Sequence, residues 1–176
     1  MPWGNLGLTE EGDSMGTPPI RILVVDDHEP WRQFIFTKLQ EQPELAIIGQ
    51  VSDGLEAVQQ AQELQPDLVL LDIGLPTLNG IQVAHRIREI APKSKILFLT
   101  ANRSPDIAEK ALSTGAGGYV VKADAGSELL PAVKAVLEGK RFISASLAGH
   151  FLMAATASTV QTLQLSWILT LISGIR

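Results

Sequence analysis

The chain of 176 residues contains no cysteine. This absence excludes disulfide bonds, thiolate catalysis and metal sites built on cysteine, and it is compatible with a reducing cytoplasm. Basic residues are fewer than acidic ones, 14 against 19, and the formal net charge is −5. Such a balance argues against a large nonspecific nucleic-acid surface, although it is compatible with a small DNA-reading helix.

The N-terminal stretch lacks the features of a secretory signal. Residues 1–19 are rich in glycine, proline and polar residues, and no apolar core follows a basic start. We therefore expect a flexible leader and a cytoplasmic protein. The length and the hydrophobic content of 45% predict one domain with a sizeable core, placed at residues 20–140.

The C-terminal extension, residues 141–176, lacks charge almost throughout. Residues 142–175 contain no Asp, Glu, Lys or Arg, so they offer no basic face for phosphates, and we expect no DNA binding by this chain alone. Residues 160–175 are apolar, but Gln161 and Gln164 interrupt them and they fall short of the roughly 20 residues that span a membrane. We favour a packed or dimer-forming helix over a membrane span.

Four apolar segments share one feature, which is a polar residue at the carboxyl end. Their closing residues are Asp26 with Asp27, Asp72, Thr100 and Lys122. Taken one at a time, each has an ordinary interpretation: an aspartate that caps a turn, a threonine in a strand, or a lysine on the surface. Their occurrence at four of the expected strand ends favours a shared site.

Strand-like and helix-like patterns alternate five times with short connections, which predicts a parallel sheet covered on both faces. Right-handed crossovers with one reversal of winding give a doubly wound, five-stranded α/β sheet in the order 2-1-3-4-5. The reversal lies between the first and third strands. Asp26, Asp27 and Asp72 should therefore meet in one cleft.

The chemistry of such a cleft follows from its charges. Two carboxylates about 4 Å apart repel by about 4 kcal/mol at an effective dielectric constant near 20, so three of them favour a divalent cation, and Mg²⁺ prefers oxygen ligands of this kind. An ionised aspartate can also act as a nucleophile toward a phosphoryl group. Lys122 would supply a positive charge and Thr100 a hydroxyl donor.

These residues resemble the receiver domain of bacterial two-component response regulators, over about residues 20–137. The matching pieces are Asp26-Asp27, Asp72 with Leu75-Pro76 and Gly80, Thr100-Ala101, and Tyr119 three places before Lys122. Segments around the first acids and after residue 118 are similar to the NarL/FixJ-type subfamily. The resemblance also implies the flavodoxin-like receiver fold.

By this resemblance the chain is a signalling protein and not an enzyme, and Asp72 accepts phosphate from a sensor histidine kinase. Asp27 and Asp72 would bind Mg²⁺ directly together with the Gly74 carbonyl, and Asp26 would bind it through water. Thr100 and Lys122 would contact the phosphoryl group.

The resemblance further implies a switch. A Thr100 hydroxyl that moves toward the phosphoryl group would leave space for Tyr119 to turn inward, and the output surface would comprise the last two helices and the strand between them. Many receivers have a cis proline after the lysine, and we expect a cis Lys122–Ala123 bond here although alanine takes that place.

Two other functions stay open at this point. One is a DNA-binding transcriptional regulator without its helix-turn-helix effector part. The other is a Mg²⁺-dependent small-molecule phosphotransferase with an aspartyl-phosphate intermediate, but such enzymes commonly place a second Asp two residues after the nucleophile, where this chain has Gly74. A homodimer is a further candidate partner, and the output target is open.

Overall fold

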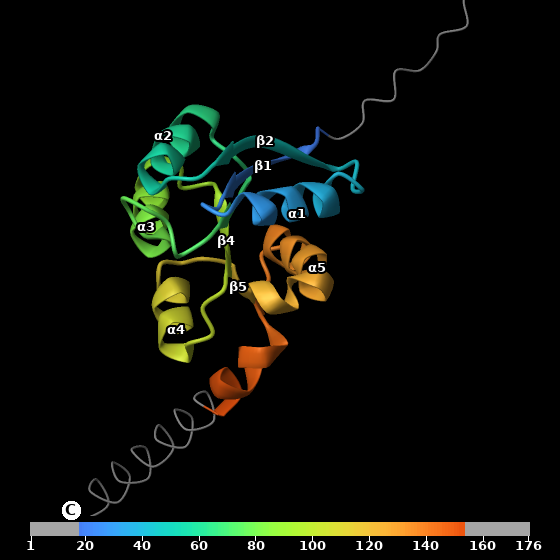
Figure 1. Cartoon of the computed structure of the whole chain (residues 1–176), viewed down its shortest axis with the longest axis vertical. Coiled ribbons are helices and arrows are strands. Elements are labelled where there is room, and N and C mark those ends of the chain that lie inside the picture. Colours follow the sequence, from blue (N-terminus) through green and yellow to red (C-terminus); the bar gives the residue numbers. More distant parts are fainter. Residues whose placement is uncertain (1–17, 154–176) are drawn as a thin grey trace, which may run out of the picture.

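The computed structural model describes residues 18–153 (Figure 1). The expected leader, apart from its last two residues, and the apolar residues 160–175 lie outside this range. Within it, one sheet has the strand order β2-β1-β3-β4-β5-β6, and all its pairs are parallel. The predicted order of the first five strands is confirmed.

The strands alternate with helices along the chain. The strands are β1 (Ile20–Val25), β2 (Leu45–Val51), β3 (Leu68–Leu71), β4 (Lys95–Thr100), β5 (Gly118–Val121) and β6 (Phe142–Ile143). The helices are α1 (Glu29–Leu39), α2 (Gly54–Leu64), α3 (Gly80–Ile90), α4 (Pro105–Ser113) and α5 (Ala125–Leu137), with a 3₁₀ turn, η1 (Lys122–Asp124), before α5.

Helices cover both faces of the sheet, as the run of apolar residues in each central strand requires (Figure 1). One buried cluster joins the sheet to α2, α3 and α4, and a second joins its other face to α1 and α5. Every residue of β3 and β5 is buried. The central strands are therefore held firmly, and their carboxyl ends form a fixed edge for polar side chains.

Local sequence signals explain where two of the helices begin. Asp53 caps α2 by accepting hydrogen bonds from the backbone N–H groups of Leu55 (2.8 Å) and Glu56 (3.2 Å). Asn79 and Gln82 form a reciprocal capping box at α3. Ser104, which also has a capping residue type, makes no side-chain cap at α4.

The sheet has one strand more than the sequence predicted. Within the residues assigned above to the extension, β6 pairs with β5, and residues 145–153 are helical. Leu147 of that segment is only 5% exposed and belongs to the core that contains α4. A strand of two residues carries no usable hydrophobic period, which is why its pattern gave no signal.

The expected cis bond after Lys122 is wrong, because every peptide bond of residues 18–153 is trans. Without proline, the trans form is favoured by about 2.5–4 kcal/mol. Lys122 instead opens η1, which leads directly into α5.

Among residues 18–153, no helix is both long enough and apolar enough to cross a bilayer.

Candidate functional site

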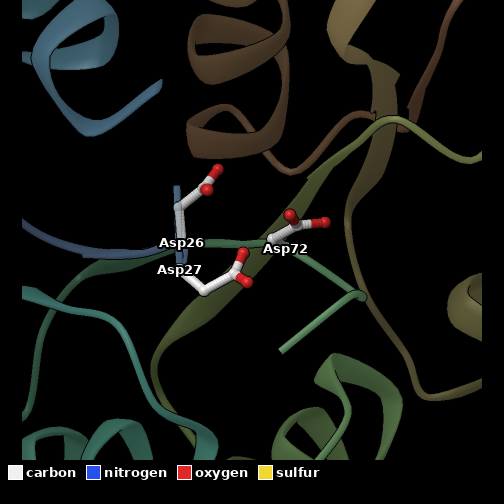
Figure 2. A group of neighbouring side chains, drawn as sticks. All are labelled: Asp26, Asp27 and Asp72. Atoms are coloured by element: carbon white, nitrogen blue, oxygen red, sulfur yellow. The ribbon is translucent and has the colours of Figure 1, made fainter. Parts of the chain in front are cut away.

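Three carboxylates gather at the carboxyl edge of the sheet. Asp26 and Asp27 follow β1, Asp72 follows the adjacent strand β3, and the side chains project from these two strand ends (Figure 2). One oxygen from each carboxylate lies within 4.8 Å of the others. Asp26 and Asp72 are buried, whereas Asp27 is exposed. The cluster is thus open to solvent through Asp27 alone of the three.

Lys122 reaches the cluster from the end of β5. Its Nζ lies 2.6 Å from Oδ2 of Asp72 and 2.7 Å from Oδ2 of Asp26, and the residue is 7% exposed. The contact with Asp72 is a hydrogen bond. The contact with Asp26 is an ion pair between two buried side chains.

Burial raises the pKa of the Asp26 carboxyl above its usual value, and the charge of Asp72 adds to this effect. Two contacts oppose it: the Lys122 ammonium, and the backbone N–H of His28, which donates to Oδ1 at 2.9 Å. The raised pKa shows that the contacts present do not fully compensate the buried carboxylate. An oxygen-only donor set that is short of positive charge fits a hard divalent cation such as Mg²⁺.

The Asp72 carboxylate is held in one orientation by its own loop. Its Oδ1 accepts hydrogen bonds from the backbone N–H groups of Ile73 (2.6 Å) and Gly74 (3.3 Å). The loop then returns so closely that a Cβ on Gly80 would lie 2.0 Å from the Asp72 carbonyl oxygen. Only glycine fits there, because any side chain would meet backbone. Gly74 itself is exposed beside the carboxylate.

Thr100 and Tyr119 lie on β4 and β5, the two strands that follow β3 in the sheet. The Thr100 hydroxyl oxygen, on a residue 3% exposed, accepts a hydrogen bond from the Asn102 N–H at 3.3 Å. Tyr119 is fully buried, and its hydroxyl donates to the Asn102 carbonyl at 3.0 Å. The Tyr119 side chain is thus buried here, and its movement on phosphorylation stays a prediction.

The environment of Tyr119 changes the acidity of its hydroxyl. Burial, together with the charge of Asp72, raises the pKa of Tyr119 to about 12. The phenol therefore remains neutral at physiological pH and acts as a hydrogen-bond donor. Asn102 is contacted by both Thr100 and Tyr119, so it links the two residues of the predicted switch.

Two neighbours of the cluster were not singled out from the sequence. The Trp31 ring centroid lies 5.4 Å from Nζ of Lys122, and Arg32 donates from Nη1 to the Asp26 carbonyl at 2.7 Å. In the sequence, Trp31 is only one of the apolar residues that recur at helical spacing, together with Phe34 and Ile35. Its position in the first helical turn after Asp26-Asp27 could have indicated this contact, because that turn begins at the carboxyl edge of the sheet, where the acids lie.

Comparison with known proteins gives one consistent result. The model of the response regulator receiver domain family matches residues 22–134. Response regulator GacA of Pseudomonas viridiflava is 33% identical over 129 residues, which cover 73% of this chain and 60% of GacA. Transcriptional regulatory protein LiaR of Bacillus subtilis (strain 168) is 33% identical over 133 residues, which cover 76% of this chain and 63% of LiaR.

A solved structure agrees with the sequence relatives. The crystal structure of a LuxR-family two-component response regulator from Aurantimonas sp. SI85-9A1 has a TM-score of 0.74 and 32% identity, and the match covers 78% of this chain and 99% of that chain. The chain spans about three fifths of the length of GacA and of LiaR.

Proposed function

Because this chain belongs to the response regulator receiver domain family, we propose that it acts as a signalling switch in which Asp72 accepts a phosphoryl group from the phosphohistidine of a sensor histidine kinase. The single observation that carries the proposal is the Asp72 carboxylate held between two backbone N–H groups and the Lys122 ammonium, beside two further acids.

The transfer needs one nucleophile and one leaving group. An oxygen of the ionised Asp72 carboxylate forms a bond to phosphorus while the phosphorus–nitrogen bond of the phosphohistidine breaks, and the electron pair of that bond stays on the imidazole. Ile73 and Gly74 hold the carboxylate in place through Oδ1. Lys122 and Thr100 then donate to the phosphoryl oxygens, which carry the added negative charge.

The acidic cluster would hold Mg²⁺ through Asp27, Asp72 and the Gly74 carbonyl, with Asp26 acting through water. The bound ion would neutralise charge on the transferred group and on the carboxylates around it. The gathering of one oxygen from each of the three carboxylates within 4.8 Å of the others supports this assignment.

Phosphorylation adds about −1.5 to −2 charges at this edge. We infer that Thr100 and Tyr119 carry the change toward a surface made of α4, β5 and α5, which would control a partner or a homodimer. The buried hydroxyl of Tyr119 and its bond to Asn102 support this route, since Asn102 lies in the segment between β4 and α4.

Transcriptional regulation is a second candidate, favoured by the name of the relative LiaR. The net charge of −5 and the uncharged residues 142–175 argue that DNA binding by this chain alone would be weak. A gel-shift titration with nonspecific duplex DNA tests this point, and micromolar binding that weakens with salt would contradict it.

The proposed function is tested by exposing the protein to phosphoramidate, a small donor with a phosphorus–nitrogen bond, in the presence of Mg²⁺. Intact mass should increase by one phosphoryl group. Asp72→Asn should abolish the increase, and Asp106→Asn, an exposed acid in the first turn of α4, should leave it unchanged. Labelling of Asp72→Asn at the rate of the unmodified protein would refute the assignment.

A further inference from the structure

Trp31 lies beside the amine that the phosphoryl group would need. It is partly buried in the first turn of α1, and its ring centroid is 5.4 Å from Nζ of Lys122. We propose that Trp31 is a positioning residue that holds the Lys122 ammonium at Asp72 by a cation–π contact. The effect of this positioning on phosphoryl transfer rests on the function proposed above, whereas the contact between Trp31 and Lys122 does not.

The Lys122 ammonium needs such a constraint because two acids compete for it. Its distances to Oδ2 of Asp72 and of Asp26 differ by only about 0.1 Å, at 2.6 and 2.7 Å. Lysine is a point charge on a flexible stem, so these two contacts alone allow the amine to settle on either carboxylate. An aromatic face within about 6 Å attracts a cation and adds a third fixed neighbour.

The ring is itself held in place. It packs edge-on against Phe34, with ring centroids 5.2 Å apart and an interplanar angle of 80°. Both aromatic residues pack against the buried cluster that joins α1 and α5 to the sheet. The same contacts would be made by any large apolar residue, so burial alone does not distinguish a positioning role from ordinary packing.

The cation–π contact provides the distinction, because leucine can fill space but has no ring face. Trp31→Leu keeps an apolar side chain and removes the attraction for the ammonium, while Trp31→Phe keeps a smaller ring. Phe36→Leu is the matched control, since Phe36 lies on the same helix and is 42% exposed.

The first measurement is the NMR signal of the Lys122 side-chain methylene protons, identified by its loss in Lys122→Met. A nearby indole face displaces these protons upfield. The displacement should disappear in Trp31→Leu, persist at a smaller size in Trp31→Phe and be unchanged in Phe36→Leu. A Lys122 signal that stays at its original position in both Trp31 variants would overturn the proposal, and Trp31→Phe decides alone if the leucine variant does not fold.

The second measurement is the initial rate of labelling by phosphoramidate with saturating Mg²⁺. Trp31→Leu should be slower by about three- to tenfold, Trp31→Phe by less, and Phe36→Leu should match the unmodified protein. Equal rates in Trp31→Leu and Phe36→Leu would refute the role in transfer. If the unmodified protein takes no label at Asp72, the proposed function fails, and the NMR measurement still decides whether Trp31 positions the amine.

Discussion

Lys122 forms a hydrogen bond with Asp72 across 50 residues of sequence, with Nζ 2.6 Å from Oδ2. The same ammonium lies 2.7 Å from Asp26, so one amine from the end of β5 joins the ends of β1 and β3. Arg32 adds a second cation at the Asp26 backbone. With Asp27 included, the acids outnumber the cations around this edge, and the cluster stays short of positive charge.

Replacing Asp26 by asparagine should stabilise the metal-free protein at pH 7. Burial raises the pKa of Asp26 above 3.8 in the folded state, so the protonated form favours folding. The stability that protonated Asp26 contributes to the folded state is fully present below about pH 3.8. It is lost as the pH rises through the raised pKa of the folded state. Asparagine is neutral at every pH, so the variant keeps this contribution to stability at pH 7.

Urea unfolding in the presence of a chelator measures this effect. The free energy of unfolding of Asp26→Asn should exceed that of the unmodified protein by a small amount at pH 4 and by a larger amount at pH 7. The difference between Asp106→Asn and the unmodified protein should show no comparable change with pH. An Asp26→Asn variant that is less stable than the unmodified protein at pH 7 would contradict the assignment.

The single tyrosine of the chain gives an independent test of burial at the switch. Tyr119 should ionise near pH 12 in the folded protein and near pH 10 in denaturant, because burial and the Asp72 charge oppose its anion. Its neutral form contributes to stability fully below about pH 10, and this contribution is lost as the pH rises toward 12. Tyrosinate absorbance reports both midpoints, and equal midpoints would show that the phenol is exposed.

Much of the fold could be predicted from the sequence, because the information was local and repeated. Apolar runs that end in polar residues marked the central strands, and Asp72 stood out since its strand is followed at once by a loop with proline and glycine. The alternation of strands and helices then limited the strand order. The position of the three acids followed from that order.

The remaining features depended on contacts that a sequence pattern does not carry. The contact of Trp31 with Lys122 depends on the direction in which α1 leaves the sheet after Asp27. Periodicity indicates only which face of a helix is apolar. The Lys122–Ala123 bond was misjudged because a property of proline was transferred to alanine. Ser144, which is fully buried, gave no signal because serine is usually a surface residue.

Ser144 links the segment after β6 to the end of β5 and to α5, the two elements on either side of Lys122. Its hydroxyl oxygen accepts from the Val121 N–H at 2.8 Å and donates to Oε2 of Glu128 at 2.5 Å. Ser144→Ala should lower the free energy of unfolding by about 1–3 kcal/mol, because the buried Val121 N–H loses its partner. Ser113→Ala, at an exposed site, is the control in urea unfolding, and equal losses in the two variants would count against this role.

Gly80 should tolerate no side chain. A Cβ there would lie 2.0 Å from the Asp72 carbonyl oxygen, so Gly80→Ala should destabilise the protein by about 1–3 kcal/mol or more. A Cβ on Gly126 in α5 would meet nothing within 4 Å beyond its own helix backbone, and Gly126→Ala should instead stabilise by about 0.5–1 kcal/mol. Thermal unfolding of the pair separates the close approach at Asp72 from the general effect of adding a methyl group.

The most direct test asks whether Asp72 is the residue that carries the phosphoryl group. Borohydride reduces an aspartyl phosphate to homoserine, so the phosphorylated protein can be reduced, digested and mapped by mass spectrometry. We expect homoserine at position 72 alone, dependent on Mg²⁺. Homoserine at Asp26 or Asp27 in place of Asp72, or none at any of the three after verified labelling, would contradict the proposed role of Asp72.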